Sequence, residues 1–304
     1  MQRTSFYEQI SKNKRDSVLL TIFVVVLVVA IVYVMSMIFL PGSAILFSTL
    51  AIVLIFLQVQ VSYNYGDQVV LKATNAMPTD PVRNIHLMNT VEGLSLAAGI
   101  PPPKTYIVND NEINAFAVGK DPEHASIAVT TGALTQLNQA ELEGVVGHEI
   151  SHIRNFDIRF MTLVAVLVGL AAILSHMLLR MYWFGGIQTR RSERRREDGS
   201  NIVILLIIAG LILAVIAPLI SRLVQAFISR RRELLADASG AQLTRYPEGL
   251  ASALEKIKNY NRGKMDVSES ISHLFIADPN RSPLDELFAT HPPLEERIRI
   301  LRAM

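Results

Sequence analysis

Four long apolar blocks constrain the fold of this chain more than any other feature. Residues 17–40 and 43–66 contain no charged residue, residues 160–179 carry His176 as their single titratable group, and residues 201–221 are uncharged but contain Pro218. Each block reaches roughly the 20 residues that a helix needs to cross a bilayer. The sequence therefore predicts four transmembrane helices.

The apolar blocks have two alternative interpretations. The last two blocks could form a pair of buried core helices, but both lack the polar face that such helices carry. The first block follows a short basic segment (Arg3, Lys12, Lys14, Arg15) and so has the start of a signal peptide. Its apolar run is too long for one and lacks a small-residue cleavage site, so we expect a retained anchor.

The blocks divide the chain into ordered parts. Pro41 and Gly42 separate the first two blocks and predict a tight helical hairpin. Residues 67–157 are water-soluble in character. Apolar periodicity predicts a helix at 81–98, strands at 105–108, 113–118 and 126–130, and further helices at 229–243, at 247–260 and after Pro293. This order predicts an α+β domain that the second hairpin splits in two.

The chemistry of the chain centres on His148-Glu149-Ile150-Ser151-His152, an H-E-x-x-H sequence. Histidines four residues apart lie on one face of a helix, so their ring nitrogens can converge on one metal ion. The carboxylate of Glu149 points toward the same space and can take a proton from a water that the metal activates. The pattern is typical of a zinc hydrolase.

The context of the motif supports this interpretation. Asn138, followed by Glu141 three residues later, predicts a capping box at the start of a helix, and apolar residues continue at helical spacing beyond it. The alternative is a core or solvated helix that carries two histidines by chance. The motif lies within the predicted helix, as the metal chemistry requires.

A catalytic zinc site needs a third protein ligand, and Glu233 is the candidate. It begins an E-x-x-x-D pair with Asp237, one helical turn later. Asp237 can accept a hydrogen bond from the far nitrogen of a metal-bound histidine and fix its tautomer. The alternative for the pair is an ordinary charged helix face beside a membrane helix. Because the ligands come from both halves of the soluble domain, both halves must lie on one side of the bilayer.

Composition excludes other kinds of site. The chain has no cysteine, so disulfides, thiolate metal ligands and a cysteine nucleophile are excluded. The net charge is only +2 and no basic face carries interleaved aromatic residues, so nucleic acid is not expected as a partner. The remaining histidines, His86, His124, His176 and His273, are interpreted as structural or solvent-exposed.

Four ordered motifs together resemble one family. They are Asn-Ala-Phe-Ala at 114–117 with Gly119, the run HEISHIRNFD at 148–157, the run RELLAD at 232–237, and Thr-His-Pro-Pro at 290–293 with Arg297. The chain resembles the HtpX family of membrane-bound gluzincin metallopeptidases, which are related to the CAAX prenyl endopeptidases. The resemblance covers essentially the whole chain, and the hydrophobic blocks fall where that family has them.

The resemblance implies a role for each residue that matches a motif. His148, His152 and Glu233 would bind one Zn²⁺ ion per subunit. Glu149 would be the general base and then the proton donor to the leaving amine. Asp237 would support a zinc-bound histidine from outside the ligand set.

Further roles concern the substrate. The resemblance implies an edge strand that pairs with an extended substrate backbone, formed by Asn114, Ala115, Phe116 and Ala117. His291 would stabilise the oxyanion or bind the metal in a resting state, and an equally weighted alternative is a cap at the start of a helix. Arg297 would support His291. Asp157 is expected to tie helices together rather than to take part in chemistry.

The fold class expected is an α+β membrane protein with four hydrophobic helices and a mostly helical gluzincin-type zinc protease domain with a small β-sheet. The predicted parts are a tail and first hairpin at 1–66, a first protease half with the H-E-x-x-H helix at 67–159, a second hairpin with a basic loop at 160–221, and a second protease half at 222–304.

The function implied is an integral-membrane zinc endopeptidase for misfolded or damaged membrane proteins, acting in quality control and stress response. An unbroken helix from His152 to Phe160 would place the metal about 12 Å from the apolar block, at the membrane surface. Membrane protease or chaperone partners, the lipid bilayer and membrane-protein substrates are the partners expected.

Orientation follows from charge. The basic N-terminus favours a cytoplasmic start, which places the catalytic site on the cytoplasmic side of the cell membrane. The loop at 181–200 conflicts with this topology because its five arginines would lie outside. Either the last hairpin inserts late or incompletely, or the ligand helices hold the loop in place.

Two other classes of function are compatible with a membrane chain that carries a metal motif. A membrane metal transporter or metal-binding scaffold without protease activity would place its acids and histidines inside the spans, near the midplane. Here the candidate ligands flank the spans, which favours the peptidase. A catalytically dead adaptor is disfavoured by the intact Glu149.

Overall fold

The computed structural model describes residues 44–166, 230–262, 265–268, 270–279 and 292–304, with scattered residues between 11 and 42. The chain divides into two compact units. Unit 1 comprises Met1–Ser17, Ser62–Val166 and Val224–Met304, and unit 2 comprises Val18–Val61 and Leu167–Leu223. All of the sheet and the candidate metal ligands belong to unit 1.

The second apolar block forms helix α2 (Ala44–Ala73). Within the described part of the chain, Ser48–Ala73 is the one helix long and apolar enough to cross a membrane, and 12% of its most apolar window is buried. Large apolar side chains of α2 are exposed, with Leu46 at 68% and Phe56 at 62%. The other three predicted spans lie wholly or mostly outside the described residues.

The sheet of unit 1 has four strands in the order β1-β2-β4-β3. They are β1 (Met77–Pro78), β2 (Lys104–Val108), β3 (Ala115–Gly119) and β4 (Ala125–Thr130). Strands β2 and β4 are parallel, whereas β1–β2 and β3–β4 are antiparallel pairs. All three longer strands were predicted from sequence, with ends that differ by one or two residues.

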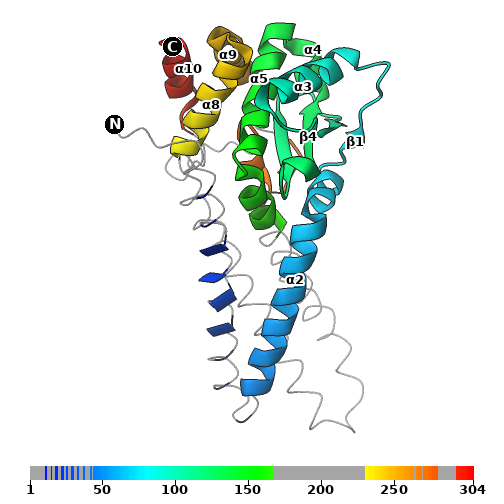
Figure 1. Cartoon of the computed structure of the whole chain (residues 1–304), viewed down its shortest axis with the longest axis vertical. Helices are drawn as coiled ribbons and strands as arrows, with labels where there is room; N and C mark the ends of the chain where they lie inside the picture. The colour runs from blue at the N-terminus through cyan, green and yellow to red at the C-terminus, as the bar shows by residue number, and fades with distance from the viewer. Residues whose placement is uncertain are drawn as a thin grey trace, which may run out of the picture. The chain divides into compact units, whose positions relative to one another are not determined.

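Six further helices belong to the described part of unit 1. They are α3 (Ile85–Ala98), α4 (Thr131–Gln136), α5 (Gln139–Arg154), α8 (Arg230–Thr244), α9 (Pro247–Tyr260) and α10 (Leu294–Leu301). Helix α5 contacts β3 on one side and α8 and α9 on another (Figure 1). Val145, Ile150 and Leu254 belong to the apolar core that joins these elements. The fold is mostly helical with a small sheet, as expected.

Two helices differ from the prediction by more than one residue. Helix α3 starts at Ile85 rather than at residue 81 because the Asp80 carboxylate accepts the backbone N–H of Val82 at 2.9 Å and holds 81–84 in turns. The expected unbroken helix between His152 and Phe160 is wrong. Helix α5 ends at Arg154, Phe156 adopts a left-handed φ of 62°, and helical backbone resumes at 157.

Candidate metal centre

Two histidines of α5 and one glutamate of α8 converge on one point. His148 Nε2 and His152 Nε2 lie 3.2 Å apart. Glu233 places Oε2 3.6 Å from the first nitrogen and Oε1 3.5 Å from the second. The three side chains are almost fully buried, at 1%, 4% and 1% exposure respectively. The structure thus brings together the three residues expected to bind a metal ion.

The start of α5 is fixed by the predicted capping box. Asn138 Oδ1 accepts the backbone N–H of Glu141 at 3.0 Å, and Glu141 Oε2 accepts the backbone N–H of Asn138 at 2.8 Å. A second anchor joins this turn to α9, because Lys256 donates to Glu141 Oε2 at 2.7 Å. These contacts fix where α5 begins and how it is rotated against α9. They therefore determine which way His148 and His152 point.

A close approach of two helix backbones brings Glu233 to the histidines. A Cβ added at Gly240 of α8 would lie 2.8 Å from the backbone nitrogen of His148, closer than real Cβ contacts allow. A Cβ at Gly147 of α5 would meet Gly240 O at 3.3 Å. Glycine at these positions lets α8 lie against α5 at the level of the candidate ligands.

Each histidine is oriented by an aspartate through its far ring nitrogen. His148 Nδ1 lies 2.9 Å from Asp237 Oδ1, and His152 Nδ1 lies 3.1 Å from Asp157 Oδ2. Both Asp side chains are buried. With Nδ1 beside a carboxylate, each ring turns Nε2 toward the other ring and toward Glu233, and a neutral ring in this tautomer offers a metal ion its Nε2 lone pair.

Both aspartates are paired with arginine. Arg297 of α10 holds Asp237 at two points, with Nε to Oδ2 at 2.8 Å and Nη2 to Oδ1 at 2.7 Å. Burial opposes ionisation of Asp237, but the Arg297 charge and hydrogen bonds hold its pKa at about 2. Arg232 Nη1 lies 3.8 Å from Asp157 Oδ1. Two His–Asp–Arg chains therefore support the cluster from opposite ends.

The donor set fits a divalent cation. Burial lowers the pKa of His148 to about 4, which keeps its ring neutral. Burial also opposes protonation of His152, but the carboxylates of Glu233 and Asp157 raise its pKa to about 9. Two imidazole nitrogens and one carboxylate are the ligands expected for a catalytic metal with one open position.

Glu149 lies beside the cluster and against the sheet. Its side chain is 1% exposed, and Oε1 has no hydrogen-bond partner in the described structure. Burial is the largest cause that raises its pKa to about 8, and a hydrogen bond from the backbone of Ala117 partly opposes the shift. A nearby cation would favour the carboxylate form, as a general base requires.

The predicted substrate strand is β3, at the edge of the sheet. Its outer edge is already paired along part of its length. Ile276 donates its N–H to Ala115 O at 3.0 Å, and Phe116 forms an isolated antiparallel bridge with Phe275. Asn114 is fully buried and donates from Nδ2 to Ala277 O at 2.9 Å. These contacts use Asn114, Ala115 and Phe116, three of the four residues expected to face substrate.

His291 lies outside the described residues, so its expected role stays a prediction. The structure places the side chain of Arg297, its expected supporter, against Asp237 and against Ile276 O, to which Nη1 donates at 2.9 Å. Arg297 is fully buried.

The sequence predicted only that Asp157 connects helices. That prediction is incomplete, because the Asp157 carboxylate also faces the ring of His152. The turn at Asn155 and Phe156 interrupts the helix just before Asp157, whose carboxylate faces His152. The sequence did contain a signal for this contact. Asp157 follows His152 by five residues, and Asn155 between them is a residue type that commonly ends a helix. Of the histidines predicted to be structural, His273 is buried with Nε2 3.2 Å from Met161 O.

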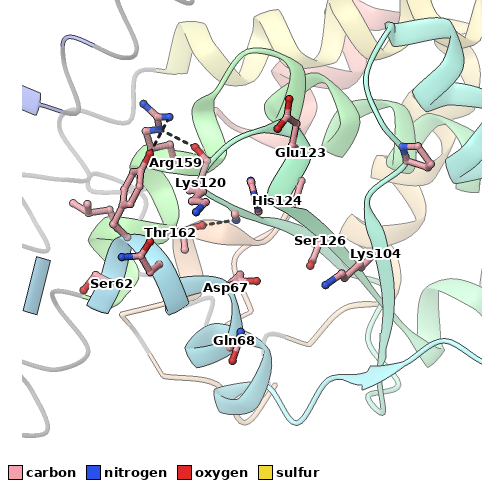
Figure 2. Close-up of a pocket in the computed structure, with 16 residues that line it drawn as sticks. Ser62, Asp67, Gln68, Lys104, Lys120, Glu123, His124, Ser126, Arg159 and Thr162 are labelled. Atoms are coloured by element: carbon pink, nitrogen blue, oxygen red, sulfur yellow. Dashed lines mark hydrogen bonds between the residues drawn. The ribbon is translucent and has the colours of Figure 1, made fainter. Parts of the chain in front are cut away.

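A separate cavity of about 270 Å³ lies where α2 meets the ends of β2, β3 and β4. Figure 2 shows its polar lining, which includes Asp67, Lys104, Lys120 and Arg159. None of the candidate metal ligands lines it. At its wall, Thr162 Oγ1 accepts the backbone N–H of Gly119 at 3.0 Å and closes the last position of the β3 edge.

Comparisons with known proteins agree with the geometry. The sequence model of peptidase family M48 matches residues 81–304. The protease HtpX homologue of Caldanaerobacter subterraneus subsp. tengcongensis is 44% identical over 305 residues, covering 100% of this chain and 99% of the relative. That of Thermoanaerobacter pseudethanolicus is 44% identical over 304 residues, with the same coverage. That of Streptococcus uberis is 39% identical over 306 residues, covering 98% of this chain and 99% of the relative.

Among solved structures, the crystal structure of S. mikatae Ste24p resembles this chain with a TM-score of 0.50 at 17% sequence identity. The likeness covers 96% of this chain and 66% of that chain. At this identity it supports the fold alone.

Proposed function

Because the chain belongs to peptidase family M48 and is a metallopeptidase, we propose that it is an integral-membrane zinc endopeptidase. We further propose that its substrates are misfolded or damaged membrane proteins, cut near the cytoplasmic surface of the cell membrane in quality control and stress response. The observation that carries the proposal is the convergence of His148, His152 and Glu233 beside Glu149 and the edge strand β3.

We assign the metal ligands as His148, His152 and Glu233. A bound zinc ion would polarise the scissile carbonyl and make water more acidic. Glu149 would take a proton from the attacking water and return it to the leaving amine. Asp237 and Asp157 would hold the two rings so that their Nε2 lone pairs point inward. The main chain near Ala117 would position substrate next to Glu149.

The exposed apolar surface of α2 supports the membrane location. A helix in the core of a soluble protein buries most of its apolar side chains, whereas α2 leaves Leu46 and Phe56 largely exposed. The transporter or scaffold alternative gains no support here, because the cluster belongs to α5 and α8 and none of its ligands lies on α2.

The direct test compares wild-type enzyme with Glu149→Gln. The variant should retain its metal, measured by elemental analysis of the purified protein, because Glu149 is not assigned as a ligand. Cleavage should fall by at least about 10² because general acid–base catalysis is removed. Comparing membrane proteomes of cells with the two forms would then identify substrates. Undiminished degradation by the variant would refute the mechanism.

Two further tests address location. Cleavage sites mapped on membrane substrates should cluster next to their apolar segments, and cuts spread evenly through large soluble domains would contradict surface cleavage. A topology reporter fused at Glu197 decides the number of crossings. A cytoplasmic signal there would exclude four full spans.

A further inference from the structure

The chain's own residues 275–277 lie along the outer edge of β3 as an antiparallel partner. Four hydrogen bonds hold the segment. Ile276 N–H donates to Ala115 O at 3.0 Å, and Ile276 O accepts from Arg297 Nη1 at 2.9 Å. Ala277 O accepts from Asn114 Nδ2 at 2.9 Å, and Ala277 N–H donates to Asn114 Oδ1 at 3.3 Å.

All four bonds go to main-chain atoms of the segment. The side chains of Ile276 and Ala277 take no part in them. The side-chain contacts of the segment are apolar: the rings of Phe275 and Phe116 have centroids 4.8 Å apart, and Ile276 and Ala277 belong to the apolar core. An extended polypeptide with apolar residues at these positions could therefore make the same hydrogen bonds and fill the same apolar positions.

The rest of the edge is also in use. The backbone of Ala117 faces Glu149, and Gly119 N–H is bound by Thr162 (Figure 2). The side chains of His148 and Glu149 are each 1% exposed. In the arrangement described, a polypeptide cannot reach this site or pair with β3. A substrate must therefore first displace a segment that already occupies the strand edge.

We propose that residues 275–277 are an internal stand-in for substrate backbone, and that substrate binds by displacing them from β3. The inference rests on the proposed function and describes how access of substrate to the active site is controlled. A substrate competes when its backbone N–H and C=O groups are unpaired, because it then offers Ala115, Asn114 and Arg297 the same partners that they lose. A segment already paired within a folded protein cannot do so. The device thus selects unfolded segments over folded ones.

The absence of cysteine in the chain permits a reversible test. Phe116 and Phe275 are directly opposed, and opposed antiparallel residues place their Cα atoms about 4.5–5.5 Å apart, within disulfide range. In the double variant Phe116→Cys/Phe275→Cys, oxidation should lower cleavage of reduced, carboxymethylated α-lactalbumin by at least about tenfold, because the competent population is removed. Reductant should restore it. Each single variant should show the same activity oxidised and reduced.

Full activity with the disulfide confirmed by mass spectrometry would overturn strand displacement while leaving the peptidase assignment intact. If wild-type enzyme shows no metal-dependent cleavage that Glu149→Gln abolishes, the proposed function itself fails. Native, disulfide-bonded α-lactalbumin should be a poor substrate for the wild-type enzyme.

A second measurement does not depend on cleavage and covers the case of an inactive double variant. In Glu149→Gln enzyme loaded with zinc, adding carboxymethylated α-lactalbumin should speed amide hydrogen exchange in the peptide covering 270–279. Native α-lactalbumin at the same concentration should leave it unchanged. Unchanged exchange with the unfolded chain at saturating concentration would refute the displacement.

Discussion

Arg297 and Asp237 form a two-point ion pair from which solvent is excluded, with N–O distances of 2.8 and 2.7 Å. Asp237 in turn faces His148, so the pair joins the C-terminal helix to the candidate metal centre. The same guanidinium binds Ile276 O. One buried arginine thus couples the metal ligands to the segment on β3.

Replacing Arg297 with Ala should destabilise the protein strongly. Removing one partner leaves the Asp237 charge buried and unpaired, which costs about 3–5 kcal/mol and lowers Tm by roughly 6–20 °C. Thermal unfolding in detergent would measure the loss. The matched control is Arg302→Ala, which removes contacts with Glu248 and Glu255 at the exposed end of the same helix and should change Tm little. Equal shifts in the two variants would contradict this account.

Asp157→Asn should weaken metal binding without unfolding the protein. The amide is a poorer acceptor for His152 Nδ1–H, and losses of this kind typically lower metal affinity by about 10–100-fold. Competition with a chelator of known affinity measures the change. Asp121→Asn is the control, because its carboxylate pairs with the exposed ring of His124 in the separate cavity. An unchanged affinity in Asp157→Asn would remove that residue from the site.

Gly240→Ala should separate the two halves of the metal centre. The added Cβ would meet the backbone nitrogen of His148 at 2.8 Å, so α8 must move and carry Glu233 away from the histidines. We expect a metal affinity at least about tenfold lower. Gly93→Ala is the control, since nothing lies within 4 Å of its Cβ on the exposed face of α3, and it should add about 0.4–1 kcal/mol of stability. Full metal binding by Gly240→Ala would show that the close approach is dispensable.

Glu141 should make stability fall in acid. Burial opposes its charged form, but the hydrogen bonds from Lys256, the Asn138 backbone and Ser252 lower its pKa below the ordinary 4.5. Because the folded-state pKa is depressed, the stabilisation is complete above pH 4.5 and is lost as the pH falls through the folded value.

Glu141→Gln isolates this charge, because glutamine can still close the capping box. The variant should show a smaller loss of stability between neutral pH and about pH 3 than wild type, measured by denaturant unfolding at each pH. Lys256→Gln removes the partner of the same ion pair. The loss of unfolding free energy in the double variant should therefore be smaller than the sum of the losses in the two single variants. Additive effects would argue against the coupling.

Local rules predicted the elements that carry the chemistry. Helix α9 has the predicted bounds 247–260, and the capping box at Asn138 and Glu141 forms as expected. These features depend on neighbours in sequence, such as apolar periodicity, turn residues and a side chain three residues from the backbone group it caps. The helical spacing of His148 and His152 is of the same kind.

Contacts between distant segments were beyond those rules. That Glu233 was a candidate could be read from its motif, but its approach to the histidines depends on two glycines that allow α5 and α8 to touch. The turn at Phe156 and the pairing of Arg297 with Asp237 likewise needed the folded chain, because a buried charge finds its partner in space rather than in sequence.

The sequence by itself determined a metallopeptidase helix and the short strands beside it, because both follow from the local spacing of side chains. Only the tertiary structure decided what surrounds them. It showed that Asp237 faces His148 and that Asp157 faces His152, buried the cluster, and paired the edge of β3 with residues 275–277. The reason is physical: an exposed strand edge and an unpaired buried charge are both unfavourable. Their hydrogen-bonding and charged groups pair with the groups that tertiary packing brings close to them.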